Sequence, residues 1–202
     1  MGTGQDHRRR SRPAPRPRLQ HLTQALSLAG RVVEVSPERY PAWRERFDAA
    51  NPDGPQRIVG IAHFEHSPLA VVLIRRGGYA VALVEGSALV AHKVGTRHVQ
   101  SRTAAGGWSQ QRFARRRGNQ ADELVRAVTE HFLRIVPAGI PQGLVVGGDK
   151  TLVGEVLEDA RMSFLEKLPR REFHDIGDPR RAVLDEVLKR ARSVEIRIDD
   201  GA

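Results

Sequence analysis

The segment LAVVLIRRGGYAVALV, residues 69–84, contains two apolar runs on either side of Arg75-Arg76-Gly77-Gly78. Short runs rich in valine, isoleucine and leucine that flank a glycine turn are typical of a β-hairpin. We therefore predict strands over residues 69–74 and 79–84. Because an antiparallel hairpin needs partners to be stable in water, further strands are expected beside it.

The flanking sequence extends this hairpin in both directions. Residues 58–63 and 88–100 also have the composition of strands, so four consecutive strands are predicted to form an antiparallel meander covered on one face. Nearer the N-terminus, residues 31–35 are a strand candidate. Ser36-Pro37 is typical of a helix start and predicts a helix that ends near Ala50.

Strands and helices alternate in the second half of the chain. Asp149 is expected to cap one helix, and Asp178-Pro179 is expected to open another. Alternation of this kind favours a partly parallel sheet, so the predicted class is α/β with a mixed sheet and helices. The predicted elements are helices over 109–135, 151–165 and 179–191 and strands over 143–146, 171–176 and 194–198.

The chain has 202 residues and a formal charge of +9, which favours an anionic partner such as nucleic acid. Residues 1–18 form an Arg- and Pro-rich tail that we expect to be disordered, and residues 19–30 are either a short amphipathic helix or a linker. Residues 31–200 are expected to form one domain. The tail contains one acid, Asp6, and six arginines: Arg8, Arg9, Arg10, Arg12, Arg16 and Arg18.

The sequence contains no cysteine, which excludes disulfides, thiolate catalysis and cysteine-ligated metals. It has no apolar run long enough to cross a bilayer and no secretory signal, so we expect a cytoplasmic protein that does not engage membranes. His63 and His66 are spaced unlike a zinc motif, and residues 146–151 fail the spacing of a phosphate-binding loop. We expect a monomer without cofactor or metal.

Residues 103–120, TAAGGWSQQRFARRRGNQ, combine features that no ordinary turn requires. Gly106-Gly107 permits a close approach to another molecule, and Gln110 and Gln111 supply neutral amides. Trp108 can stack on a base or fold back on the domain. The following helix start carries four cations suited to phosphate: Arg112, Arg115, Arg116 and Arg117.

The run GGWSQQRFARRR resembles the Gly-Gly-Gln loop and helix of eukaryotic and archaeal class I peptide-release factors. It is closer still to the release-factor-like domain of ribosome-quality-control peptidyl-tRNA hydrolases, in the compact form of actinobacteria. Aligning the two on residues 112–115 puts Trp108 where the family has glutamine. The resemblance implies a ribonuclease H-like fold and hydrolysis of the peptidyl-tRNA ester, in an active centre that the ribosome and the tRNA complete.

The resemblance also implies residue roles. Gln110 would position the attacking water, with Gln111 as the alternative, and Gly106 and Gly107 would set the loop geometry. The expected partners are the large ribosomal subunit, its rRNA and peptidyl-tRNA. The residues expected to contact RNA are Trp108, Ser109, Arg112, Arg115, Arg116, Arg117, Arg102 and Arg97.

Two other functions remain open at this stage. A nuclease of the same family would cut tRNA near its 3′ end and leave a shortened tRNA. A non-catalytic factor would occupy the ribosomal A site during stress or hibernation. This alternative stays open because Gln110 is displaced by two residues from the position of the glutamine in the family.

Overall fold

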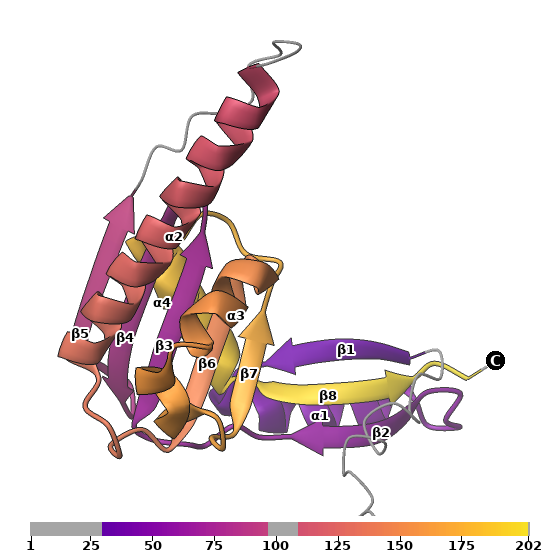
Figure 1. Cartoon of the computed structure of the whole chain (residues 1–202). Helices are drawn as coiled ribbons and strands as arrows, with labels where there is room; N and C mark the ends of the chain where they lie inside the picture. Colours follow the sequence, from indigo (N-terminus) through magenta and orange to yellow (C-terminus); the bar gives the residue numbers. More distant parts are fainter. Residues whose placement is uncertain (1–29, 97–108, 202) are drawn as a thin grey trace, which may run out of the picture.

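A computed structural model describes residues 30–96 and 109–201 of the protein; the side chains of residues 109–117 lie outside this description. At its centre is a five-stranded sheet, the main sheet, with the order β5-β4-β3-β6-β7 (Figure 1). The first three strands along the chain are antiparallel, whereas β6 and β7 run parallel to β3. The predicted hairpin and mixed α/β class are thereby confirmed. The strands are β3 (Leu69–Arg75), β4 (Gly78–Glu85), β5 (Ala88–Thr96), β6 (Gly143–Gly148) and β7 (Arg170–Phe173).

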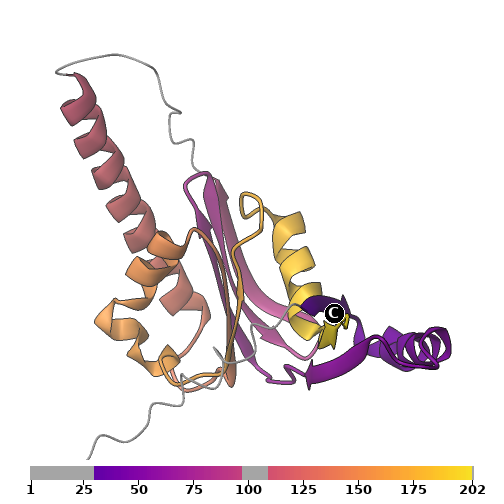
Figure 2. The same ribbon diagram turned by 90° about the vertical axis from the view of Figure 1, so that its right-hand side faces the viewer.

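Helices cover both faces of the main sheet, as the side view in Figure 2 shows. One face carries α2 (Ser109–Ile135), α3 (Lys150–Leu157) and the 3₁₀ helix η3 (Ala160–Leu165), and the other carries α4 (Arg181–Arg192). The expectation of a sheet covered on one face is therefore wrong. β3 is apolar and buried from Leu69 to Ile74, which is the pattern of a strand buried on both sides.

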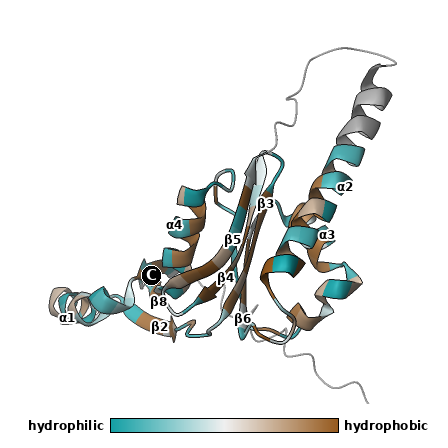
Figure 3. Ribbon diagram, turned by 90° about the vertical axis from the view of Figure 1, so that its left-hand side faces the viewer, coloured by the Kyte–Doolittle hydropathy of each residue, from teal (hydrophilic) through white to brown (hydrophobic). Residues whose placement is uncertain are grey.

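Two apolar cores result. Leu124, Val128 and Phe132 of α2 are fully buried against β3 and β4. On the opposite face, Leu184 and Val187 of α4 pack on the alternate residues of the same strands. Figure 3 shows that the strands between these helices consist largely of apolar residues. The hairpin is thus the shared wall of both cores, which explains why its sequence is continuous in apolar residues.

A second, three-stranded antiparallel sheet, the small sheet, has the order β1-β8-β2 and lies apart from the tip of α2 (Figure 1). The sequence predicted the strands but not this pairing, since β8 was expected in the main sheet and β2 in the meander. α1 packs on one face of the small sheet, where Trp43 and Phe47 stack with centroids 5.3 Å apart. The elements are β1 (Gly30–Val35), η2 (Pro37–Arg39), α1 (Tyr40–Ala50), β2 (Arg57–Ala62) and β8 (Val194–Asp199).

Arg190 of α4 connects the small sheet to the main sheet. Its guanidinium bonds to Glu34 of β1 at 3.0 Å and to Asp175 at 3.1 Å, and it lies 4.7 Å from the ring centre of Phe173. These bonds raise the pKa of Arg190 and lower that of Asp175. One side chain of α4 thereby links β1, near the start of the described chain, to β7 and the turn that follows it.

Several element ends differ from the predictions for local reasons. The helix predicted over 151–165 is broken between α3 and η3, because Asp159 caps the start of η3 with a bond from the Arg161 amide. The strand predicted over 171–176 ends at Phe173. Asp178 does not cap α4, whose N-cap is Arg180, and pairs instead with Arg75 at 3.8 Å.

Of the two other expected helix starts, one has the predicted side-chain cap and the other does not. Asp149 caps α3 as predicted and accepts bonds from the amides of Thr151 and Leu152 at 3.0 and 3.3 Å. Ser36 is an N-cap without a side-chain bond, and its helix begins as a 3₁₀ turn before α1. No helix in the described ranges is long and apolar enough to cross a bilayer.

Candidate functional site

The candidate site is built on α2, a 27-residue helix. Among the side chains described in it, residues 118–135, the first that is fully buried is Leu124, and Gly118 is exposed. At 1.5 Å per residue, the helix rises about 22 Å from Ser109 to Leu124. Figure 1 shows this N-terminal part extending beyond the end of the main sheet. α2 therefore presents its first turns away from the body of the protein.

An aromatic contact holds α2 against the main sheet. Tyr79 of β4 stacks on His131 of α2, with ring centroids 5.7 Å apart and planes 13° apart. The same ring lies over Gly95, its register partner in β5, where a Cβ would come within 2.3 Å of the tyrosine. A glycine is needed there because a side chain would displace the ring. β5 and α2, the two elements on either side of residues 97–108, are thus tied to the same tyrosine.

The residues predicted to form the site fall into two groups. Arg97, Arg102, Gly106, Gly107 and Trp108 lie outside the described residues, so their roles stay predictions. The others belong to the first turns of α2, where the backbone is helical. Helical spacing puts positions i, i+3 and i+4 on one face, which groups three of the arginines. This second group is Ser109, Gln110, Gln111, Arg112, Arg115, Arg116 and Arg117.

The carboxyl edge of the main sheet, where β3, β5, β6 and β7 end, lies at the same end of the molecule as these turns (Figure 1). Three exposed cations stand on it: Arg76 in the β3–β4 turn, Lys150 at the start of α3 and Arg180 before α4. No hydrogen bond or ion pair engages their side chains within the described part of the chain. The sequence analysis predicted none of them as a site residue: Lys150 lies in the segment 146–151 that was rejected as a phosphate-binding loop, and Arg76 and Arg180 resemble ordinary turn or helix-start residues.

Other charges on this edge are neutralised within the fold. Arg75 pairs with Asp178, and Arg181 pairs with Asp185 at 3.0 Å. His174 bridges the Gly148 carbonyl oxygen at 3.0 Å and Glu172 at 3.1 Å. Among the described residues of the turns at this edge, Arg76, Lys150 and Arg180 are therefore cations that an outside partner can bind. Together with the arginines of α2 they extend the expected anion-binding region from the helix onto the sheet.

Comparison with known proteins agrees with the sequence resemblance. No curated protein matches the chain. The model of one family, described as the Actinobacteria/chloroflexi VLRF1 release factor, matches residues 67–197, which is more than half of the 202 residues. The match spans β3 to β8 and so includes α2 and the whole main sheet. The chain therefore belongs to the Actinobacteria/chloroflexi VLRF1 release-factor family and has a ribosome-associated, release-factor-like role.

Proposed function

We propose that this protein hydrolyses the ester bond of peptidyl-tRNA and so frees nascent chains from stalled large ribosomal subunits. The observation that carries the proposal is the N-terminal part of α2, which extends beyond the end of the main sheet (Figure 1). The helix begins at Ser109, next to Gln110 and Gln111, and Leu124, about 22 Å along it, is the first fully buried residue among its described side chains. A helix of this shape suits insertion of its tip into a narrow RNA-walled site.

Hydrolysis of the ester requires few chemical groups from the protein. A water oxygen attacks the ester carbonyl carbon and the bond to the ribose oxygen breaks. The ribose oxygen takes up one of the two protons of the water, and the other passes to the solvent. The products are a peptide carboxylate and a tRNA with a free 3′-hydroxyl. Holding the water in line with the carbonyl supplies much of the acceleration, since well-oriented reactants gain up to roughly 7–11 kcal/mol. In this scheme the amide of Gln110 orients the water, and Gln111 is the alternative.

Electrostatics supports an RNA partner. The arginines of α2 stand at a helix N-terminus, where the helix dipole disfavours positive charge, and a phosphate would reverse that penalty. Arg76, Lys150 and Arg180 are exposed on the neighbouring carboxyl edge of the main sheet. In the proposal these cations hold the domain, acting as a monomer in the cytoplasm, against rRNA and the tRNA while the loop over residues 103–108 enters the active centre.

The test is incubation of the purified protein with a stalled large subunit that carries peptidyl-tRNA. Ester hydrolysis predicts released peptide and a full-length tRNA whose CCA end keeps its 3′-hydroxyl. A shortened tRNA would instead identify the nuclease alternative. Binding without any released product at saturating protein would favour a non-catalytic factor in the A site and would refute the hydrolase.

A further inference from the structure

The small sheet has one covered face and one open face. Successive residues of a strand point to opposite sides. Ile196 of β8 and its register partner Val33 of β1 face α1 and are buried or half-buried. Val32 pairs with Arg197 and so belongs to the opposite face. A cavity of about 480 Å³ lies there, lined by residues of β1, β8 and β2 and by none of the described helices.

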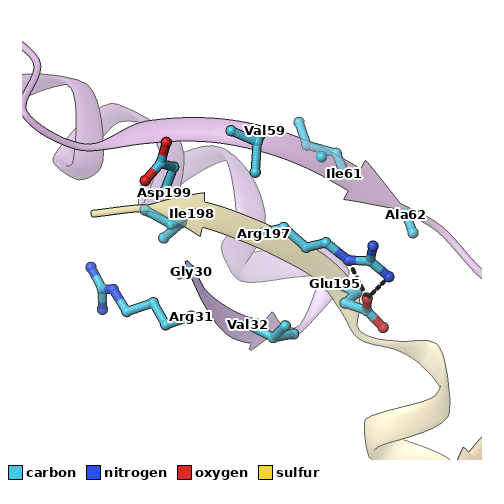
Figure 4. Close-up of a pocket in the computed structure, with 11 residues that line it drawn as sticks. Gly30, Arg31, Val32, Val59, Ile61, Ala62, Glu195, Arg197, Ile198 and Asp199 are labelled. Atoms are coloured by element: carbon cyan, nitrogen blue, oxygen red, sulfur yellow. Dashed lines mark hydrogen bonds and ion pairs between the residues drawn. The ribbon is translucent and has the colours of Figure 1, made fainter. Parts of the chain in front are cut away.

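Apolar side chains gather around this cavity (Figure 4). Val32 is 58% exposed and Val59 53%, and both line it. They are two of the five large apolar side chains that are exposed in the described part of the chain. Single exposed apolar residues are common, but a cluster over a hollow is typical of a contact surface. The Arg197–Glu195 ion pair, at 3.3 Å, gives one side of the cavity a polar border.

The chain itself leads directly to this cavity. Gly30, the first described residue, lines it. The preceding residues 19–29, LQHLTQALSLA, lie outside the described residues and contain no acid, lysine or arginine. Leu19, Leu22 and Leu26 recur at helical spacing and would share one helix face.

The length of residues 19–29 also matches that of the open face. Eleven residues in a helix span about 16 Å, and the six residues of β1 span about 20 Å. A helix that doubles back at Gly30 would therefore run along most of the strand. The segment matches the open face in apolar character, in length and in its point of attachment.

The geometry points to residues 19–29 as the occupant of the open face, packed as an amphipathic helix with Leu22 and Leu26 on Val32 and Val59. The small sheet would then carry a helix on each side. The arginines of residues 8–18 would begin at its surface, distant from the tip of α2 in Figure 1. The protein would thus meet an extended anion at two separated points.

Engineered cysteines test this docking directly, because the natural sequence has none. In the full-length protein, Leu22→Cys or Leu26→Cys is combined with Val59→Cys, and the matched control is Gln24→Cys with Val59→Cys. Docking predicts that mild oxidation closes an intramolecular disulfide in at least one leucine pair, at least tenfold faster than in the control. Equal rates would overturn the proposal, and disulfide-linked dimers would show that a second copy covers the face.

A second measurement does not depend on cysteine geometry. Leu22→Asp with Leu26→Asp is expected to accelerate hydrogen exchange of the β2 amides at least tenfold, whereas Gln20→Asp with Gln24→Asp leaves it unchanged. Unaltered exchange in the leucine variant would contradict the docking. Neither readout involves the ribosome, so the result is independent of the hydrolase proposal.

Discussion

Tyr79 and His131 stack with their ring centroids 5.7 Å apart, and this contact joins the central hairpin to the helix that carries the candidate site. The tyrosine ring also covers Gly95, its register partner in β5. The orientation of α2 on the main sheet therefore depends on a glycine in the neighbouring strand, an arrangement in which an aromatic ring covers a cross-strand glycine.

Gly95→Ala is expected to destabilise the protein by about 1–3 kcal/mol, because the new Cβ would meet the Tyr79 ring at 2.3 Å and force it off His131. Urea denaturation followed by circular dichroism measures the change. Retention of full stability would mean that the ring has room to move and does not fix α2.

Gly118→Ala is expected to have the opposite sign. Gly118 lies inside α2, and a Cβ built there meets nothing within 4 Å. Alanine should stabilise the helix by up to about 1 kcal/mol, since glycine is the poorer helix former. The same denaturation series measures this change. A loss of stability would show that Gly118 is needed for a conformation other than the straight helix.

Arg190→Ala is expected to lower the free energy of unfolding by roughly 0.5–3 kcal/mol, because it detaches Glu34 and Asp175 from α4. The folded pKa of Asp175 is lowered, so its stabilising contribution is present above the ordinary carboxyl pKa near 3.9 and is lost as the pH falls through the folded value.

The difference between wild type and Arg190→Ala should therefore be larger at pH 7 than at pH 3. The matched control is Arg181→Ala, whose partner Asp185 is half exposed, and its effect should stay within about 0.5 kcal/mol at both pH values. A difference that does not change with pH would remove Asp175 from the explanation.

Two triple variants test the anion-binding region. Replacing Arg112, Arg115 and Arg116 with alanine, or likewise Arg76, Lys150 and Arg180, should weaken large-subunit binding and flatten its salt dependence. Each lost phosphate contact should reduce the slope of log K against log salt by about 0.7–0.9. Lys167→Ala, an exposed cation at the opposite edge of the main sheet, is the control and should change neither. Unchanged slopes for a triple variant would make that cluster an ordinary solvated surface.

Local sequence predicted most elements of this fold but not their pairing. The apolar runs and glycine turn of the β3–β4 hairpin are short-range signals, and α2 was predicted to within about one residue at each end. The small sheet was missed because β8 pairs with β1 from the other end of the chain, and nothing in either strand specifies so distant a partner. Asp178 failed as a predicted cap for a similar reason, since Arg75 binds it from another element.

The sequence predicted the chemistry of the candidate site better than its position in the fold. Residues 103–120 stood out because glycines, glutamines and arginines are combined there without a packing reason. Arg76, Lys150 and Arg180 carried no such signal, because only the parallel pairing of β3, β6 and β7 brings their turns to one edge. The role of Gly95 could not be predicted either, because a glycine is required there only to make room for Tyr79 of the neighbouring strand.

The most direct test of the account is single-turnover release of peptide from large subunits that carry peptidyl-tRNA, at saturating protein. Wild type and the Gln110→Ala variant are compared, with Gln111→Ala measured in parallel. If Gln110 orients the water, Gln110→Ala loses release while it keeps its fold and its affinity for the subunit, because the substitution removes only the amide that holds the water. Loss of release in Gln111→Ala alone would move the role to that residue. Full release by both variants would contradict the proposed hydrolysis mechanism.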